Sequence, residues 1–172
     1  MRTVQLDKNA GGKKLREYCN QDGAVECFLL PPAVRDAGDA DVADFGVRHG
    51  NLTLTFDKGF MLNAAPRIVG INPGILPMRT DDNSFEQVST KTAPKMLRAF
   101  KEQFPEWHEV PWLNTILELT PTLIIVYQTW DVPPKKIELL KRDEEGWQNR
   151  LKELLQQNAH GPLAKSLGHD SQ

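Results

Sequence analysis

One alternating segment constrains the fold of this chain most. Leu52, Leu54 and Phe56 alternate with Thr53 and Thr55. In an extended chain a period of two places the apolar residues on one face and the threonines on the other. Residues 52–56 are therefore predicted to form a strand that packs on one face and meets water on the other, as is common in antiparallel sheets.

Turn signals flank this strand on both sides. Asp57-Lys-Gly59 matches a three-residue hairpin loop with glycine at the left-handed position, and His49-Gly-Asn51 indicates a comparable reversal one strand earlier. Residues 60–62 would return from the hairpin, and residues 68–71 would form the next strand. Together these signals predict an N-terminal antiparallel β-meander.

The N-terminal third contains simpler patterns. Residues 1–24 are polar, with a short helix predicted over Lys13–Cys19. Val25–Leu30 is predicted as a strand that Pro31 ends, because proline cannot donate to a β-ladder. The acidic residues 35–44 are expected to form a surface loop. The Pro-, Gly- and Asp-rich segment from Asn72 to Thr90 is also interpreted as a long surface loop, of a length that is often functional.

Helical signals dominate the second half. Thr92 is predicted to cap a helix with Pro94 in its first turn, and Pro105 is predicted to end it. Pro111 is predicted to open a second central helix that runs to Leu119. The β-branched density of residues 122–127 favours one further apolar strand, buried on both faces.

A long amphipathic helix is predicted from Pro134 to Asn158, because its apolar residues are spaced by three and four. These are Ile137, Leu140, Trp147, Leu151 and Leu154. The fold class expected from all these elements is α+β, with the N-terminal meander, two central helices, the further strand and this C-terminal helix. A mixed sheet with one helical crossover is the alternative.

Length and composition favour one globular domain over residues 1–172. The 172 residues are 40% hydrophobic, enough to bury roughly two thirds of the unfolded surface. Within this domain, a polar N-terminal segment (residues 1–24) and a loosely held tail (residues 161–172) are expected. Cys19 and Cys27 lack the spacing of a metal knuckle, so reduced thiols are expected.

Charge and hydropathy argue against two classes of partner. Lys and Arg number 21 against 23 Asp and Glu, a formal net charge of −2, so no bulk charge favours nucleic acid or an anionic membrane. No run approaches the roughly 18 apolar residues of a membrane span, and the N-terminus lacks the apolar core of a signal peptide. A soluble cytoplasmic protein is expected.

The segment Gly70-Ile-Asn-Pro-Gly74 resembles the first motif of the mismatch-specific branch of the uracil-DNA glycosylase superfamily, over residues 68–75. In that family the asparagine positions the water that attacks the sugar carbon after the base is flipped out. The resemblance implies a DNA-base glycosylase activity with Asn72 as its catalytic residue. The family's second motif has only His160-Gly-Pro162 as a counterpart. Asn-Pro-Gly is also an ordinary turn sequence.

No other motif indicates catalysis. The acidic residues Asp36, Asp39, Asp41 and Asp44 lack the spacing of a calcium loop, and the histidines are dispersed. No phosphate-binding glycine loop or nucleophile signature is present. The sequence therefore predicts no metal and no cofactor.

These patterns favour a non-enzymatic accessory protein that binds a protein partner or assembles with itself into a homo-oligomer. Tryptophans contribute heavily to contact hot spots. The partner-binding surface is predicted on the C-terminal helix and the Asn72–Thr90 loop. Trp107 and Trp130, which are flanked by polar residues and prolines, are also predicted to lie at the surface. The predicted contact residues are Trp107, Trp130, Ile137, Leu140, Trp147, Leu151 and Leu154.

Overall fold

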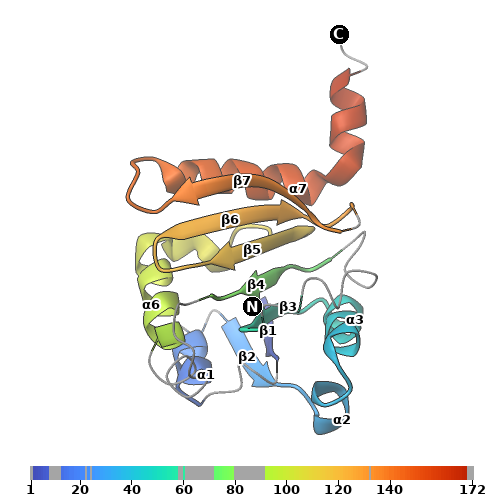
Figure 1. Ribbon diagram of the computed structural model, residues 1–172, viewed down its shortest axis with the longest axis vertical. Helices are drawn as coiled ribbons and strands as arrows, with labels where there is room; N and C mark the ends of the chain where they lie inside the picture. The colour runs from blue at the N-terminus through green and yellow to red at the C-terminus, as the bar shows by residue number, and fades with distance from the viewer. Residues whose placement is uncertain are drawn as a thin grey trace.

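The computed structural model describes residues 2–7, 13–21, 23, 25–57, 60, 72–79, 92–131 and 133–161, with helical backbone continuing to His169. Its centre is one seven-stranded sheet of order β2-β1-β3-β4-β5-β6-β7 (Figure 1). The strands are β1 (Arg2–Leu6), β2 (Val25–Leu29), β3 (Leu52–Thr55), β4 (Ile75–Pro77), β5 (Thr115–Leu119), β6 (Leu123–Gln128) and β7 (Lys135–Lys141). Helices and strands are thus mixed, which confirms the coarse class expected from the sequence.

Strand direction divides the sheet into two parts. Strands β1 to β5 pair in parallel. The antiparallel pairs are β5 with β6 and β6 with β7. The predicted N-terminal meander is therefore wrong, because β1, β2, β3 and β4 all run in one direction.

Helices cover both faces of the parallel part. Figure 1 shows α1 (Lys13–Asn20) and α6 (Ala93–Gln103) on one side of the sheet, and α2 (Pro32–Arg35) and α3 (Asp39–His49) on the other. A 3-10 turn, η3 (Pro105–His108), follows α6. The last helix, α7 (Trp147–His169), loses helical geometry at Gly161, where φ is 66° and ψ is −164°.

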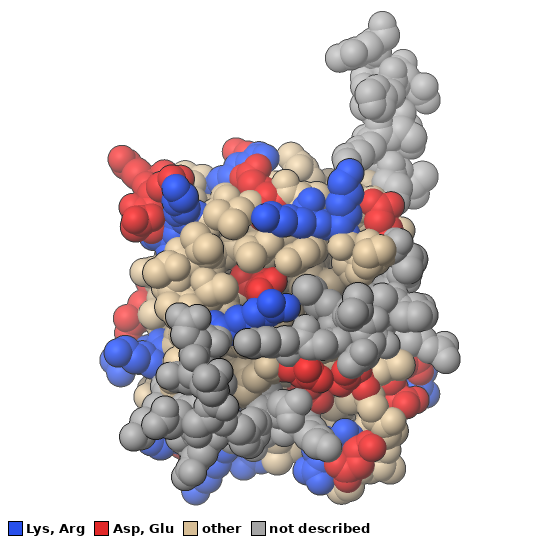
Figure 2. All heavy atoms as spheres, in the orientation of Figure 1, with Lys and Arg blue, Asp and Glu red and all other residues tan. Residues whose placement is uncertain are grey.

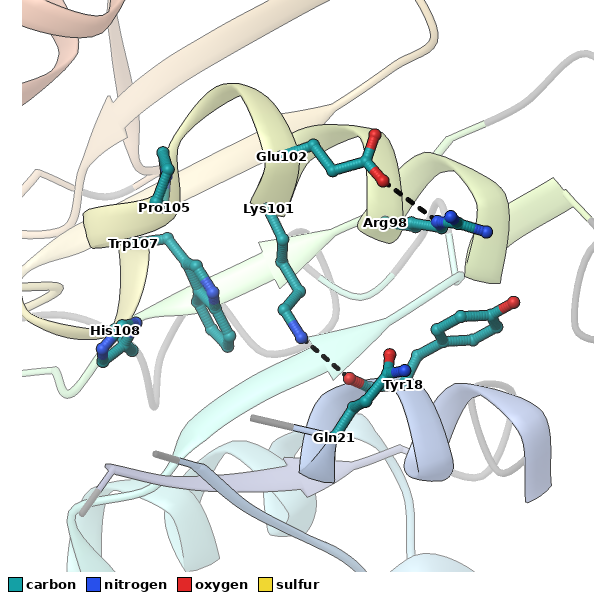
Figure 3. A pocket seen from close by; sticks show the side chains of 8 residues that line it. All are labelled: Tyr18, Gln21, Arg98, Lys101, Glu102, Pro105, Trp107 and His108. Carbon is teal, nitrogen blue, oxygen red and sulfur yellow. Dashed lines mark hydrogen bonds and ion pairs between the residues drawn. The ribbon is translucent and has the colours of Figure 1, made fainter. Parts of the chain in front are cut away.

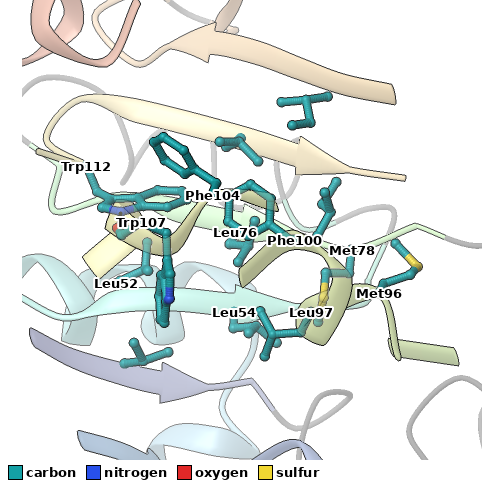
Figure 4. Close-up of a cluster of buried hydrophobic side chains, with 14 of the residues drawn as sticks. Leu52, Leu54, Leu76, Met78, Met96, Leu97, Phe100, Phe104, Trp107 and Trp112 are labelled. Atoms are coloured by element: carbon teal, nitrogen blue, oxygen red, sulfur yellow. Dashed lines mark hydrogen bonds between the residues drawn. The ribbon is translucent and has the colours of Figure 1, made fainter. Parts of the chain in front are cut away.

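Two hydrophobic clusters lie on opposite faces of the sheet. The larger one joins α1, α6 and α7 to the strands, and Figure 4 shows the apolar side chains of α6 packed against leucines of β3 and β4. Within it Trp112 donates its indole N–H to the carbonyl of Trp107 at 2.7 Å. The smaller cluster lies under α2 and α3 and includes Val42, Ala43 and Ile116. The sheet is therefore the middle of three layers.

Several sequence predictions are confirmed within the described residues. α1, β2, β3, α6 and β6 lie where their patterns indicated, and Pro94 lies in the first turn of α6. However, all four residues of β3 are buried, because α3 covers the threonine face. That face is lined by hydrogen-bonded polar side chains rather than by water.

Other predictions are wrong for identifiable reasons. The reversal at His49-Gly-Asn51 is the end of α3, whose cap Gly50 has a φ of 68°, since a left-handed glycine ends helices as readily as it turns hairpins. The acidic loop contains the start of α3. The helix predicted from Pro111 is replaced by β5. Of the other hairpin loop, Lys58 and Gly59 lie outside the described residues, as do residues 61–71 and 80–91.

The predicted helix from Pro134 to Asn158 divides into a strand and a helix. Residues 135–141 form β7, and α7 starts only at Trp147. Gly146, with a φ of 82°, precedes the helix. The apolar spacing therefore predicted a helix correctly for the second half of the segment. The first half is a strand instead, because it pairs with β6.

Candidate functional site

The chain order places a topological switch point between β1 and β3. After β1 the chain crosses to β2 on one side, and after β3 it crosses to β4 on the other side. The chain therefore leaves the carboxyl ends of the neighbouring strands β1 and β3 in opposite directions. Ligands of open α/β sheets bind in the crevice at such a point, outside the carboxyl ends of the strands.

Two aspartates follow these two strands. Asp7 comes directly after β1 and is only 3% exposed. Asp57 comes two residues after β3 and is half-buried. The Thr55 hydroxyl donates to Asp7 Oδ2 at 2.8 Å and accepts the backbone N–H of Asp57 at 3.1 Å. One hydroxyl group thus links the Asp7 carboxylate to the main chain at Asp57.

A buried polar layer anchors α3 beside this pair. Gln5 Nε2 donates to Thr53 Oγ1 at 2.9 Å and to the Val42 carbonyl at 2.8 Å. Asn51 Nδ2 donates to Gln5 Oε1 at 3.2 Å. Because α3 leads from the end of β2 to the start of β3, its first turn lies toward the carboxyl edge. Asp39, in that turn, therefore lies toward the same edge as Asp7.

Gly46 permits the close approach of α3 to the sheet. A Cβ at this position would lie 2.9 Å from Thr53 Oγ1 and 3.0 Å from Gln5 Nε2. Both atoms are already held in hydrogen bonds, so neither can move away without breaking one. Because Gly46 has no side chain, α3 can lie close to the sheet and keep its hydrogen bond with Gln5 of β1.

The donor atoms of the pair suit a hard cation. Carboxylate oxygens are preferred by Mg²⁺, which proteins hold through one or two carboxylates with water and substrate phosphate completing its shell. No group of three or more His, Cys, Asp or Glu able to hold a metal occurs in the described part of the chain. Two carboxylates match this simpler magnesium arrangement. Asp7, Asp39 and Asp57 each make a further interaction.

A second polar group lies on the same face of the sheet. Arg79 Nε lies 2.8 Å from Glu118 Oε1, and the Tyr127 hydroxyl donates to Glu118 Oε2 at 3.0 Å. Burial, and then the negative charge of Glu118, raise the pKa of Tyr127 to about 12. The Glu118 carboxylate, 3% exposed, is thereby held between a cation and a phenol.

Asn72 lies at the amino end of β4 and is 2% exposed. Its Oδ1 accepts the backbone N–H of Gly74 at 2.9 Å, the bond of an Asx turn. Its backbone N–H donates to Asn114 Oδ1 at 3.1 Å. The amide is thus engaged with its own turn at the edge of the sheet opposite to Asp7. Ile68 to Ile71, which carry the rest of the motif's strand, lie outside the described residues.

Most of the residues predicted to bind a partner lie in the core of the chain. Trp107 was expected on the surface and is 2% exposed, so that expectation is wrong. The exposed fractions of Leu140, Trp147, Leu151 and Leu154 are 7%, 5%, 0% and 2%. Their burial within the chain leaves little of these side chains for a partner, and their role in binding stays a prediction.

Trp130 and Ile137 are only half-buried and line one groove together with Leu154. The groove, about 630 Å³, runs between β7 and α7 as far as Gly161. The structure therefore brings three of the predicted contact residues together along one groove, with Trp130 and Ile137 the more exposed of the three.

A larger cavity of about 700 Å³ lies between α1 and α6. Figure 3 shows it bordered by Tyr18, Arg98 and Lys101, with Trp107 and His108 of η3 at one end. Lys101 Nζ donates to the Tyr18 carbonyl at 2.9 Å. This cavity is on the face of the sheet opposite to α3.

Asp7 and Asp57 were not among the site residues predicted from the sequence. Each follows a short segment in which apolar and polar residues alternate, residues 3–6 and 52–56, and that alternation is the signal that could have found them. The predicted antiparallel meander gave no reason to group these two aspartates, because only parallel strands bring their carboxyl ends to one edge of the sheet. The acidic residues of α3 were noted but were assigned to a solvated loop.

The face of the molecule visible in Figure 2 carries residues of both charges. Figure 2 shows acidic residues gathered on the side where α3 lies, with basic and acidic residues interspersed elsewhere on that face. Within the described residues, no helix is both long and apolar enough to cross a bilayer.

Comparison of the chain with protein-family models, with curated proteins and with solved structures finds no match. Function is therefore argued from the site.

Proposed function

We propose that this chain is an enzyme that hydrolyses a phosphate ester, using a divalent cation held by Asp7 and Asp57. The observation that carries the proposal is the buried Asp7 carboxylate, linked through Thr55 to Asp57 at the switch point of a doubly wound sheet. This proposal replaces the leaning toward a non-enzymatic protein that sequence patterns suggested.

The two aspartates differ in environment, which suits different tasks. Asp7 is nearly inaccessible and is oriented by the Thr55 hydroxyl, as expected of a fixed ligand. Asp57 is half-buried and follows the strand end, so it can meet both cation and substrate. A bound magnesium-like ion supplies Lewis acidity and a more acidic water. The acidic first turn of α3 lies toward the same edge of the sheet.

The test has two readouts, cation binding and catalysis. Mn²⁺ binding is measured by electron paramagnetic resonance, and hydrolysis of a generic phosphodiester is followed with Mg²⁺ or Mn²⁺ and with a chelator. Asp7→Asn and Asp57→Asn are expected to abolish both. Asp44→Asn is the matched control, because Asp44 lies on α3 but pairs with Arg48 at 3.0 Å on the surface.

Thr55→Val tests the orienting hydroxyl separately. Removing a group that positions a metal ligand costs about 10-fold to 100-fold in affinity or activity, so a loss of that size is expected without loss of the fold. Circular dichroism and thermal unfolding check each variant. Mn²⁺ binding that survives both aspartate substitutions in folded protein would place the cation elsewhere and end the proposal.

A second candidate function, protein binding or self-assembly, is favoured by the groove that Trp130, Ile137 and Leu154 share. Trp130→Ala truncates a half-buried wall of this groove and is expected to weaken any complex while leaving the monomer folded. Light scattering over a wide dilution range measures the native mass. A protein that stays monomeric at every concentration would remove self-assembly.

A further inference from the structure

The two cysteines of the chain meet across α1 and β2. Cys19 and Cys27 are the only cysteines in the sequence, and they are 1% and 4% exposed. The Asn20 side chain holds the two segments together, because its Oδ1 accepts the Cys27 N–H at 2.6 Å and its Nδ2 donates to the Cys27 carbonyl at 3.2 Å. The two thiols are near enough for an interaction between them to shift the pKa of each.

A lysine makes the pair asymmetric. Lys101 donates to the carbonyl of Tyr18, the residue before Cys19. The interaction with the Cys27 thiol, and in addition the charge of Lys101, lower the pKa of Cys19. The same interaction, with burial, raises the pKa of Cys27. Cys19 is thus the cysteine that ionises more readily to a thiolate, whereas Cys27 stays protonated as a thiol.

The cavity between α1 and α6 lies beside this pair. Tyr18, the residue before Cys19, and Lys101 line it, whereas Cys19 and Cys27 are themselves buried, 1% and 4% exposed. Reactive cysteines are those with a stabilised thiolate and an approach for the oxidant, often beside a second thiol that resolves the oxidised sulfur.

We propose that Cys19 and Cys27 form a reversible intramolecular disulfide on exposure to hydrogen peroxide. The Cys19 thiolate attacks the peroxide, giving a sulfenic acid and, after protonation of the departing hydroxide, one water. The Cys27 sulfur then attacks the sulfenic sulfur, and its proton leaves with the hydroxyl group as a second water. Two thiols lose two hydrogens and two electrons, and one peroxide becomes two waters.

The experiment counts free thiols in the folded protein. The chain is treated with a small excess of hydrogen peroxide, unfolded in the presence of a maleimide, and weighed by mass spectrometry. We expect a monomer that lacks both maleimides and is two hydrogens lighter, and we expect dithiothreitol to restore both labels. Both thiols labelled after peroxide treatment, or a disulfide-linked dimer, would overturn the proposal.

Single variants test the order of events. In Cys27→Ser the sulfenic acid at Cys19 should persist and be trapped by dimedone, whereas Cys19→Ser should give little trapped product. The opposite labelling would contradict the assigned roles. Lys101→Gln should slow the loss of thiols several-fold. The matched control is Lys95→Gln, an exposed lysine on the same helix, which should leave the rate unchanged.

Discussion

Gly74 shows how one residue can be required by its surroundings. It precedes β4 with a φ of 114°, and a Cβ there would lie 2.8 Å from both Cβ and O of Trp112 and 2.9 Å from Leu52 Cδ1. Both Trp112 contacts involve the main chain or the atom fixed to it, so rotation of a side chain cannot relieve them. The sequence marked this glycine as part of a turn, but only the packing of Trp112 over it explains the requirement.

Gly74→Ala is expected to destabilise the fold by about 2 to 5 kcal/mol, since positive-φ strain and overpacking add. Gly50→Ala is the control, because Gly50 has a φ of 68° but nothing within 4 Å of an added Cβ. It should cost about 1 to 2 kcal/mol. Urea unfolding measures both, and equal costs would show that the contacts with Trp112 are relieved by local movement.

At the scale of residues, part of the candidate site could be predicted from the sequence. Asp39 was noted within an acidic run, and Asp57 within a turn. The Thr55 hydroxyl joins the Asp7 carboxylate to the main chain at Asp57, and no spacing rule relates residues that are separated by two parallel crossovers. The partnership therefore appears only when β1 and β3 lie side by side.

At the scale of elements, the contact between β7 and α7 is held by an ion pair. Arg150 Nε and Nη2 each donate to a Glu138 oxygen at 2.7 Å. Hydrogen bonding to Arg150 lowers the pKa of Glu138 below its ordinary 4.5. In the sequence these residues belonged to one predicted helix, whereas in the structure they join a strand to a helix.

The pKa of Glu138 is depressed in the folded state. The stability that its ion pair contributes is therefore complete above pH 4.5, the ordinary pKa, and is lost as the pH falls through the lower folded-state pKa. Glu138→Gln should therefore lower stability near neutral pH and flatten the acid limb of the stability curve. The side chains of Arg150 and Glu138 are 41% and 31% exposed. Solvent screening of this ion pair therefore limits the loss of stability to about 1 kcal/mol.

Thermal unfolding from pH 7 down to pH 3 is the measurement for this pair. Glu145→Gln, at an exposed position in the turn before α7, is the control and should retain the wild-type slope. An unchanged acid limb in Glu138→Gln would mean that the ion pair adds nothing to stability.

For the whole molecule, α7 completes the larger core. Leu151 and Leu154 are 0% and 2% exposed and belong to the same cluster as Leu6 and Leu117. Sequence spacing predicted that these leucines face a partner chain. The partner they face is the sheet of their own chain, which is the alternative that periodicity by itself does not distinguish.

Leu151→Ala is expected to destabilise the fold by about 2 to 5 kcal/mol, the usual cost of a cavity in a packed core. Gln156→Ala, at an exposed position of the same helix, should stay within about 0.5 kcal/mol of wild type. Guanidinium unfolding gives both values, with light scattering alongside. If Leu151→Ala dissociated an oligomer without loss of monomer stability, the leucines would belong to an interface instead.

The sequence by itself determined local structure where the pattern was strong. β-Branched density specified β6, alternation specified β3, and Pro94 with its apolar face specified α6, because these signals act over a few neighbouring residues. The order and direction of the strands were decided only by tertiary structure. Residues 135–141 form a strand because they pair with the edge of β6. Asp7 and Asp57 lie at one edge of the sheet because parallel crossovers bring the carboxyl ends of β1 and β3 together.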